Sequence, residues 1–534
     1  MKKLLAFILL TSILIGCAPE TQPTPQATPQ SAPVQTATSA PETESTQWWH
    51  DAVFYEIFVR SFNDSNGDGI GDFNGITQKL DYLQSLGVTA LWLMPIHPSP
   101  SYHGYDVLNY YAVNPDYGTL ADFKNLLNEA HKRNIKIIID LVLNHTSSQH
   151  PFFVDANSNP TSKYRDWYVW SNKPGVHWVQ GNGGYYFALF CDCMPDLNYR
   201  NPEVTKQMFN VTKYWLNIGV DGFRLDAAKH LIEEGNKIEN TDSTHEWLKG
   251  FYTFYKRINR NAYTVGEVFG AGAFLATKYT QQTDHIFNFE LASGIVNSVS
   301  GESNSGINSA WKFTLKDITN GEYATFLTNH DQNRVMSVLN GNEAKAKLAA
   351  VMLLTSPGTP FIYYGEELGM QGKKPDEDIR LPMQWNADAN AGFTTGIPWR
   401  APDANYLQVN VAAQEKDPQS LLNLYRTLAK LRAEYPVLRI GSLTLLDTSN
   451  TGVYAILRYN NAENMLVLIN LKGTSITDYG LSLNEKLLSD GTLSPLSLLD
   501  STTATALIVS GGVFKSYKPI SELSPYQALI FQLK

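Results

Sequence analysis

The feature that most constrains this chain is a series of eight short apolar runs separated by amphipathic segments. Each run is nearly continuous in apolar or β-branched residues, as expected for strands buried on both faces of a parallel sheet. The intervening segments have a helical period, as in Ile76, Leu80 and Leu83. The runs span residues 52–62, 90–96, 136–145, 222–228, 263–269, 285–290, 323–331 and 360–368. Eight strands alternating with helices predict an α/β protein built as a (β/α)8 TIM barrel.

Two further regions depart from this alternation, and we expect each to form a domain. Residues 146–200 make a connection too long for an ordinary loop and rich in aromatic residues, which predicts an inserted domain after the third strand. After residue 435, alternating apolar segments are separated by Gly, Asn and Ser, a pattern typical of antiparallel strands. We therefore predict a barrel over residues 48–435 and a C-terminal antiparallel β domain over residues 436–534.

The N-terminal part has the character of an export signal. Lys2 and Lys3 precede an apolar run at residues 4–15, which is too short to span a bilayer but is typical of a signal peptide. The run ends in Gly16 and Cys17, which resembles the bacterial lipoprotein signal, so residues 1–17 are interpreted as a lipoprotein signal with lipidation at Cys17. The alternative is an ordinary signal peptide with an incidental cysteine. Residues 18–47, rich in Pro, Thr, Gln, Ser and Ala, predict a disordered linker.

Charge and composition narrow the possible partners. The net charge of -9 at pH 7 leaves no basic patch that would favour nucleic acid. We expect an exported monomer, held by the Cys17 lipid at the bacterial cell surface or membrane. Aromatic residues make up 12% of the chain, which suits stacking on sugar rings. Cys191 and Cys193 are one residue apart, so we expect neither a disulfide, which would be strained, nor a four-thiolate zinc site.

Polar side chains gather at the carboxyl ends of four predicted strands. In a barrel of this kind these ends form the active site. A single acidic residue there is more often a helix cap, but four clusters on correctly ordered strands are hard to explain as caps. The clusters consist of Asp140, Asn144 and His145; Arg224 and Asp226; Glu267; and Asn329, His330 and Asp331.

The segments that carry these clusters resemble the four signature regions of the α-amylase family of glycoside hydrolases, family 13. They are residues 140–145, 222–230, 266–269 and 326–331, and residues 194–198 and 358–367 resemble two secondary signatures. The resemblance implies retaining cleavage of α-glucosidic bonds, with Asp226 as nucleophile, Glu267 as general acid/base and Asp331 as transition-state stabiliser. It also places the chain in a subgroup intermediate between oligo-1,6-glucosidases and neopullulanases.

The two principal carboxyl groups need different protonation states. A retaining glycosidase holds a carboxylate at the anomeric carbon and a carboxylic acid at the leaving oxygen, about 5–5.5 Å apart. Arg224 lies two residues before Asp226, on the same face of the strand, and is expected to lower the pKa of Asp226. Burial and nearby carboxylates are expected to keep Glu267 protonated.

The resemblance also implies a set of substrate-binding residues. Tyr105 would stack on the sugar ring, and Asp376 with Arg380 would bind the next sugar on the non-reducing side, although a surface ion pair is an equal alternative. The implied residues are His103, Tyr105, His145, Arg224, Lys229, His230, His330, Asp376 and Arg380.

The sequence resembles enzymes of two different bond specificities. Ala227 and the pair Lys229-His230 resemble α-amylases acting on α-1,4-linked chains, whereas residues 380–385 and 391–393 resemble oligo-1,6-glucosidases. We expect an endo-acting α-amylase on starch, maltodextrins and related α-glucans. The alternatives are an exo-acting α-glucosidase or oligo-1,6-glucosidase, a transglycosylase, or a catalytically inactive glucan-binding surface lipoprotein.

One or two calcium ions are expected. A loop after the first strand places oxygen ligands at alternate positions, as calcium loops do, although a metal-free series of turns is the alternative. Its candidate ligands are Asp64, Asn66, Asp68, the carbonyl of Ile70 and Asp72. The family resemblance implies a second ion between the barrel and the inserted domain, with ligands Asn144, Asp196 and the carbonyl of His230.

Overall fold

The structure is a computed structural model that describes residues 47–270, 273–318 and 322–534. The predicted signal segment with Cys17, and the predicted linker up to residue 46, lie outside the described residues. Within the described ranges, no helix combines the length and the apolar character needed to cross a membrane.

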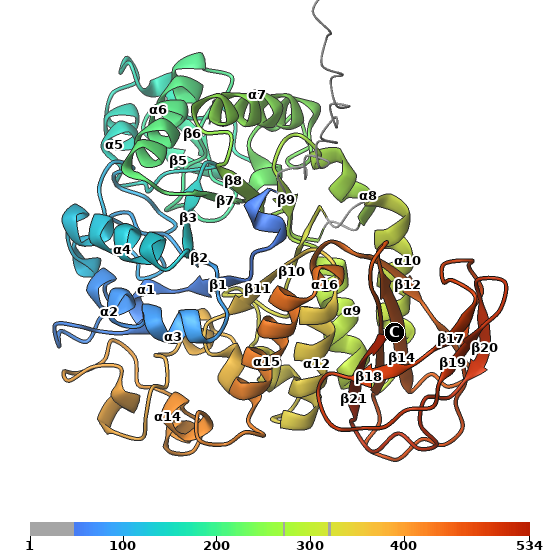
Figure 1. Ribbon diagram of the computed structural model, residues 1–534. Helices are drawn as coiled ribbons and strands as arrows, with labels where there is room; N and C mark the ends of the chain where they lie inside the picture. The colour runs from blue at the N-terminus through green and yellow to red at the C-terminus, as the bar shows by residue number, and fades with distance from the viewer. Residues whose placement is uncertain (1–46, 271–272, 319–321) are drawn as a thin grey trace, which may run out of the picture. The chain divides into compact units, whose positions relative to one another are not determined.

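Eight parallel strands form the predicted barrel (Figure 1). They are ordered β10-β11-β1-β2-β3-β7-β8-β9, and a parallel bridge between Phe287 and Ala324 joins the two outer strands. The (β/α)8 prediction is therefore confirmed. The strands are β1 (Phe54–Ile57), β2 (Ala90–Leu93), β3 (Lys136–Val142), β7 (Gly222–Asp226), β8 (Tyr263–Gly266), β9 (His285–Ile286), β10 (Ala324–Thr325) and β11 (Thr359–Tyr363).

Helices follow the strands, and several have sequence-encoded ends. Thr119 and Asp122 form a reciprocal capping box at the start of α4, and Gly219 ends α6 in the left-handed conformation that glycine adopts without steric cost. The longer helices are α2 (Phe73–Gln78), α3 (Leu80–Ser85), α4 (Leu120–Lys132), α6 (Pro202–Ile218), α7 (Asp242–Ile258), α9 (Phe289–Ser300), α10 (Ser305–Asp317), α12 (Glu343–Thr355) and α15 (Leu421–Glu434). Shorter helices are α1 (Val59–Phe62), α8 (Ala273–Ala276), α11 (Val335–Val338), α13 (Asp376–Ile379), α14 (Val411–Gln414) and α16 (Pro436–Ile440).

Several strands are shorter than their apolar runs. The run at 323–331 contains only β10, and the run at 285–290 contains β9 and then the start of α9. Asn288 caps α9 by accepting a hydrogen bond from the amide of Leu291, which ends the extended stretch. The residues beyond the strand ends therefore belong to the loops that build the site.

The barrel interior is aromatic at one end and polar at the other. Because side chains alternate along a strand, Phe54 and Glu56 of β1 point to the same face. The rings of Phe54 and Phe361 stack 4.2 Å apart within a buried cluster that also includes Trp92 and Phe287. Such pairs each contribute roughly 0.5–1.5 kcal/mol beyond the area that they bury. The core thus holds the strands in register beneath the polar end.

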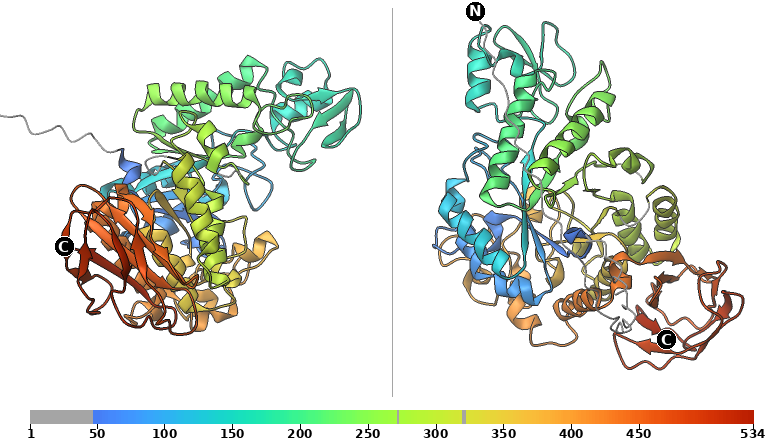
Figure 2. Two further views of the ribbon diagram at one scale, coloured as in Figure 1. Left: turned by 90° about the vertical axis from the view of Figure 1, so that its right-hand side faces the viewer. Right: turned by 45° about the horizontal axis from the view of Figure 1, so that its top comes forward.

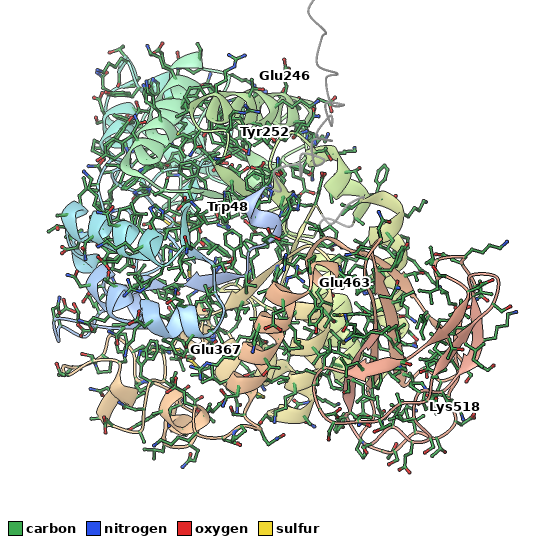
Figure 3. The ribbon with its side chains drawn as sticks, in the orientation of Figure 1. Trp48, Glu246, Tyr252, Glu367, Glu463 and Lys518 are labelled. Carbon is green, nitrogen blue, oxygen red and sulfur yellow. A yellow bond between two sulfur atoms is a disulfide. The ribbon has the colours of Figure 1, made fainter. Side chains whose placement is uncertain are left out.

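A second buried layer lies between the strands and the helices. Glu367, labelled in Figure 3, is fully buried directly after β11, where it accepts hydrogen bonds from Tyr55 at 2.8 Å and Tyr82 at 2.5 Å. These bonds connect the end of β11 to β1 and α3 and satisfy a polar group that burial would otherwise penalise.

The connection after β3 carries its own small sheet. Its strands are ordered β4-β6-β5 and are antiparallel. The segment contains α5 (Pro151–Ser158), β4 (Trp170–Ser171), β5 (Trp178–Gly181) and β6 (Gly184–Phe187). A bridge from His145 to Asp196 ties the end of the segment to the residues that follow β3, and a bridge from Tyr168 to Leu197 joins two parts of the segment itself.

The C-terminal region forms antiparallel sheets, as predicted (Figure 2). Its main sheet is ordered β12-β14-β15-β21-β18, and it contacts α10 where Trp311 donates a hydrogen bond to Tyr454 at 2.9 Å. The strands are β12 (Ser442–Leu445), β13 (Asp447–Thr448), β14 (Val453–Tyr459), β15 (Asn464–Asn470), β16 (Leu481–Leu483), β17 (Gly491–Leu493), β18 (Pro495–Ser497), β19 (Leu507–Val509), β20 (Phe514–Tyr517) and β21 (Ala528–Leu533).

Candidate active site

A pocket of about 460 Å³ lies at the carboxyl ends of the barrel strands. It is large enough for a bound sugar, and most of the predicted site residues line it. These are His103, Tyr105, His145, Asp226, Lys229, His230, Glu267, Asp331, Asp376 and Arg380. The structure thus brings the three predicted catalytic acids into one cavity.

Arg224 and His330 lie behind this lining rather than in it. Arg224 is 1% exposed and His330 is fully buried, so neither side chain faces the pocket. Both side chains contact the catalytic acids, as expected for Arg224, and the expected contacts of Arg224 and His330 with a sugar stay predictions.

One guanidinium group links the two principal carboxyl groups. The Nη1 atom of Arg224 lies 2.5 Å from Oδ1 of Asp226, and Nη2 lies 3.0 Å from Oε2 of Glu267. Nη1 also lies 2.9 Å from Oδ1 of Asp140. Strand pairing explains the geometry, because Arg224 pairs with Asp140 on β3 and with Val265 on β8. A planar guanidinium can contact several carboxylates at once.

Burial dominates the protonation of Asp226 and Glu267. It raises the pKa of Asp226 above its ordinary value, and Arg224 opposes this shift. Burial likewise raises the pKa of Glu267; Arg224 opposes that shift, whereas the charges of Asp226 and Asp331 add to it. The rise at Glu267 agrees with the expected proton donor. The net rise at Asp226 differs from the expected lowering, because removing the carboxylate from water outweighs the neighbouring positive charge.

Asp331 has the opposite environment. Burial opposes its ionisation, but the charged His330 and Arg380 beside it lower its pKa. Its carboxylate lies 3.1 Å from Nε2 of His330 and 3.0 Å from Nη2 of Arg380. Burial also disfavours a charged His330, yet Asp331 and Glu56 together raise the pKa of His330 to about 9. Asp331 is therefore held ionised.

Tyr105, the expected ring platform, lines the pocket and contacts His330. The hydroxyl of Tyr105 lies 2.6 Å from Nε2 of His330, and the two rings stack 5.6 Å apart. His103 bonds the backbone amide of Tyr105 through Nδ1 at 3.1 Å. His145 is 2% exposed, and its Nε2 has no hydrogen-bond partner in the structure. Burial lowers the pKa of His145 to about 4, so a neutral imidazole is available to a sugar hydroxyl.

The remaining predicted subsite residues make specific pairs. Asp376 lies 3.1 Å from Arg380, which also contacts Asp331, so this pair is part of the pocket wall. The ammonium of Lys229 is committed to two partners, 2.6 Å from Glu239 and 2.9 Å from the carbonyl of Phe269. Lys229 therefore holds the loop after β8 in addition to lining the pocket.

Several functional positions were not predicted. Glu56 is 2% exposed and lies 2.5 Å from Nδ1 of His330. Glu56 could have been identified as a functional candidate because it is a charged residue within the apolar run of the first strand. Phe190, Met194 and Phe269 also line the pocket. These three residues could have been predicted to line the pocket because they lie in or near two of the signature segments, residues 194–198 and 266–269.

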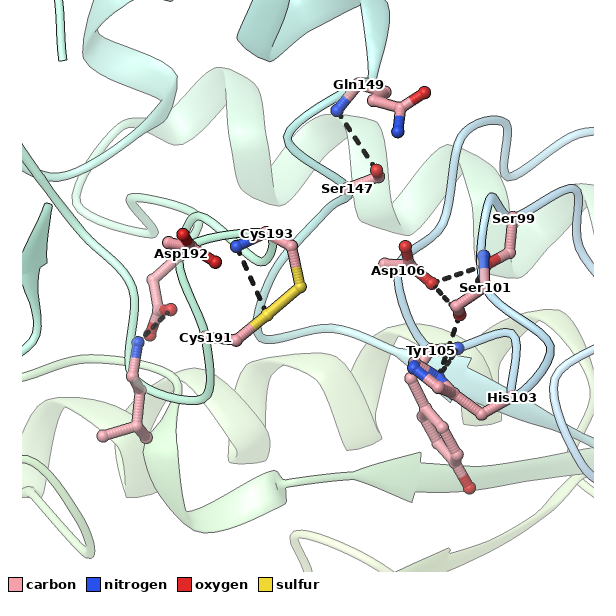
Figure 4. The surroundings of a disulfide bond; sticks show 12 residues. Ser99, Ser101, His103, Tyr105, Asp106, Ser147, Gln149, Cys191, Asp192 and Cys193 are labelled. Carbon is pink, nitrogen blue, oxygen red and sulfur yellow. Dashed lines mark hydrogen bonds between the residues drawn. A yellow bond between two sulfur atoms is a disulfide. The ribbon is translucent and has the colours of Figure 1, made fainter. Parts of the chain in front are cut away.

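The two cysteines contradict the expectation from their spacing. Cys191 and Cys193 form a disulfide, with Cα atoms 5.2 Å apart (Figure 4). The amide of Met194 donates to the carbonyl of Cys191 at 3.0 Å, and this turn brings the two cysteines together. A separation of 4.4–6.8 Å is usual for disulfides, so the expectation of two unlinked cysteines was wrong.

The predicted calcium loop after β1 is satisfied by its own amides. Asp64 accepts hydrogen bonds from the amides of Asn66, Gly67 and Gly69, and Asp72 caps α2 through the amide of Gly75. Asp68 accepts from the amide of Ile70. Within the described ranges, ligand atoms of three His, Cys, Asp or Glu residues converge only at residues 191–193, where both sulfurs are bonded. The carboxylates of this loop are therefore engaged by its own amides, and a calcium ion here stays a prediction.

The second predicted calcium site fits better. Asp196 is 1% exposed and accepts a hydrogen bond from Asn144 at 3.0 Å, while Oδ1 of Asn144 is buried without a partner. Oε1 of Glu233 is also buried without a partner, and its charge adds to the burial that raises the pKa of Asp196 well above its ordinary value. Buried oxygens that lack donors suit a calcium ion, which takes carboxylate and amide oxygens. His230 is nearby in sequence, and its Nδ1 donates to the carbonyl of Ile238 at 2.9 Å.

Comparisons with known proteins agree with this geometry. A family model described as "Alpha amylase, catalytic domain" matches residues 56–441. Alpha-amylase 3 of Dictyoglomus thermophilum is 44% identical over 434 residues, which cover 79% of this chain and 85% of that protein. An oligo-1,6-glucosidase of Heyndrickxia coagulans is 35% identical over 525 residues, covering 81% and 93%.

Solved structures give the same result. A crystal structure of alpha-amylase from H. orenii superposes with a TM-score of 0.79 at 38% identity, covering 90% of this chain and 99% of that one. The family model and these matches together establish the family, and the contacts of Arg224 with Asp226 and Glu267 agree with it. The chain belongs to the alpha-amylase family of glycoside hydrolases, family 13.

Proposed function

We propose that this protein is a retaining, endo-acting α-amylase that hydrolyses α-1,4 bonds of starch and maltooligosaccharides. The observation that carries the proposal is the contact of Asp226 and Glu267 with one guanidinium, that of Arg224. This shared contact is compatible with retention, which needs the two carboxyl groups about 5–5.5 Å apart, whereas an inverting enzyme needs roughly 6.5–9.5 Å for a water molecule.

The proposed mechanism assigns one task to each acid. Glu267, protonated in its buried position, donates a proton to the leaving oxygen while Asp226 attacks the anomeric carbon. Glu267 then removes a proton from water, which hydrolyses the glycosyl-enzyme. Asp331, held ionised by His330 and Arg380, binds sugar hydroxyls and stabilises the positive charge of the transition state.

Bond preference has support on both sides. The similarity to alpha-amylase 3 favours α-1,4 bonds, and so does the presence of Lys229 and His230 in the pocket lining. The similarity to oligo-1,6-glucosidases and to a trehalose-6-phosphate hydrolase of Bacillus subtilis supports the second candidate, an exo-acting α-glucosidase. The higher identity to alpha-amylase 3 favours the first.

Product analysis distinguishes these functions. The protein is incubated with maltoheptaose, and the length and anomeric form of the products are followed over time. Endo action with retention yields α-anomers of several intermediate lengths from the start. Glucose as the sole early product, or faster cleavage of isomaltose, would replace the endo proposal by the exo one. Asp226→Asn should abolish hydrolysis; unchanged hydrolysis in this variant would refute the mechanism.

The cellular location remains a proposal based on sequence. We propose that the chain is exported and anchored through a lipid on Cys17, because residues 1–17 have the composition of a lipoprotein signal. Expression of the full chain and of Cys17→Ser, followed by membrane fractionation, tests this. The native chain should be in the membrane fraction and the variant should not; equal distribution would exclude lipidation at this residue.

We also propose that a calcium ion binds between the barrel and the inserted segment. Asn144, Asp196 and Glu233 would hold it through side-chain oxygens, together with the carbonyl of His230. The two buried oxygens without partners support this site. An ion there would connect the end of β3 to the inserted segment that borders the pocket.

A further inference from the structure

The disulfide between Cys191 and Cys193 lies at the wall of the active-site pocket. The residues that flank it in sequence, Phe190 and Met194, both line the pocket. Met194 is 8% exposed and packs into the wall, whereas Phe190 is 50% exposed. A half-exposed phenylalanine at the rim of a pocket offers an apolar ring surface to a bound molecule.

Contacts place Phe190 on the side of the pocket that receives the leaving sugar. Its ring lies 5.8 Å from the ring of His230 and 5.4 Å from that of His145, both edge to face. The amide of Ala227 donates to Oε2 of Glu267 at 3.0 Å, and His230 ends the short helix Ala228–His230 that follows Ala227, so His230 and Glu267 border the same side of the pocket. Glu267 protonates the leaving oxygen in the proposed mechanism, and the sugar beyond that oxygen lies on its side.

The segment that carries Phe190 is held from several directions. The amide of Leu189 donates to Asp196 at 3.0 Å, and the amide of Ser148 donates to the carbonyl of Cys193 at 2.8 Å. The hydroxyl of Tyr186 donates to the carbonyl of Asp192 at 2.8 Å. Figure 4 shows the disulfide beside Ser147 and across from His103 and Tyr105. The disulfide links the two ends of the exposed turn at Asp192, which lies between these hydrogen bonds.

The bridge restricts the backbone next to Phe190. Fixing a residue in one backbone conformation costs conformational entropy, so without the bridge this exposed turn would sample more conformations. Phe190 precedes the first cysteine directly, and its ring position depends on the turn. A stacking surface binds a sugar well only when it is already in position.

We propose that the Cys191–Cys193 disulfide is a positioning element that fixes Phe190 as a stacking surface for the sugar on the leaving-group side. By favouring chains that extend over Phe190, it determines which bonds of a maltooligosaccharide are cleaved. The inference rests on the proposed function, since it presumes an oligosaccharide in the pocket. Phe190 provides the contact, and the disulfide acts through it.

The test compares three variants of the full chain with the native protein. C191S/C193S removes the bridge with little change in volume, and F190A removes the ring. F313A is the matched control, because Phe313 on α10 is also 50% exposed but does not line the pocket. With maltoheptaose, we expect KM to rise roughly three- to tenfold in C191S/C193S and F190A, as for loss of one stacking contact, with a smaller change in kcat. The distribution of product lengths should shift in the same direction in both, and F313A should match the native protein.

A dithiol reductant provides an independent arm. It transfers two electrons to the disulfide, giving two thiols on the protein while the reagent becomes a disulfide itself. Alkylation and mass spectrometry of the peptide containing residues 191 and 193 monitor the reaction. Reduction should give the native protein the product distribution of C191S/C193S and leave that variant unaffected.

Three results separate the possible failures. A native product distribution in folded C191S/C193S, with F190A altered, would overturn the role of the disulfide; native behaviour of both would overturn the inference entirely. If the native protein does not cleave maltoheptaose, the proposed function fails. Equilibrium binding of maltoheptaose to the same variants then decides whether the bridge and Phe190 shape the site.

Discussion

The guanidinium of Arg224 lies 2.5 Å from the carboxylate of Asp226, two residues later on the same strand. Its other terminal nitrogen contacts Glu267 on the neighbouring strand. One cation thus adjoins both the proposed nucleophile and the proposed acid. Since burial raises the pKa of both acids, Arg224 is the principal group favouring ionised Asp226. The fold places that group by strand register alone.

Arg224→Lys should therefore lower kcat on maltoheptaose by about 100-fold or more, the range seen when a preorganised charge contact is lost. Lysine keeps the positive charge but, as a point charge, cannot contact Asp226 and Glu267 in the same planar geometry. The measurement is steady-state kinetics on folded protein. Arg432→Lys is the control, because Arg432 is equally buried but bonds only backbone carbonyls away from the pocket. It should lose stability and keep kcat; a native kcat in Arg224→Lys would contradict this role.

His330 should make the protein sensitive to alkaline pH. Its folded pKa of about 9 is raised above the value of about 6.5 for an unfolded chain. A raised pKa adds stability that is complete below about pH 6.5 and is lost as the pH rises through about 9. Melting temperature and kcat should therefore fall between pH 7 and pH 10, because neutral His330 no longer balances Glu56 and Asp331.

The variant His330→Gln checks this assignment. It cannot become charged, so its melting temperature should be lower than that of the native protein at pH 6–7 and should change less between pH 7 and pH 10. A variant whose melting temperature falls as steeply as that of the native protein would assign the alkaline transition to another group.

The barrel was predictable because its strands are buried on both faces. The runs beginning at residues 136, 222 and 263 start at the same residues as β3, β7 and β8. The predicted ends extend too far, since apolar residues such as Phe269 continue into the loops and line the pocket. A run of apolar residues indicates that a segment is buried, and the buried segment can continue past the end of the strand.

The acids were predictable from their signature segments, but their surroundings were not. Glu56 contacts His330 only because the sheet closes on itself, a relationship between residues far apart in the sequence. The disulfide was excluded from spacing alone, yet the turn at Asp192 brings both cysteines within bonding distance. The net rise in the pKa of Asp226 depends on how deeply the barrel buries it. Contacts that form only when the barrel folds cannot be predicted from the local sequence.

The proposed calcium site predicts that a chelator destabilises the protein. A ligand at about 100 times its Kd stabilises the folded state by roughly 2.7 kcal/mol, so a chelator should lower the melting temperature by several degrees. Asp196→Asn should remove this response, because Asp196 is the buried carboxylate of the proposed site. Asp68→Asn, in the loop after β1, distinguishes the two predicted sites. If Asp68→Asn abolishes the response and Asp196→Asn retains it, the ion binds in the loop.

The contact between α10 and the C-terminal sheet should contribute measurably to stability. Trp311 is fully buried, and its indole N–H donates to the hydroxyl of Tyr454, which is 1% exposed. Tyr454→Phe leaves that buried donor without an acceptor, so we expect a loss of about 1–3 kcal/mol in the free energy of unfolding. Denaturant titration measures the loss, and Tyr406→Phe, at a partly exposed ring, is the control with an expected change within about 0.5 kcal/mol. Equal effects of the two substitutions would show that the bond to Trp311 adds nothing beyond an ordinary tyrosine hydroxyl. Activity of folded Tyr454→Phe on maltoheptaose should stay at the native level, because neither Trp311 nor Tyr454 lines the pocket.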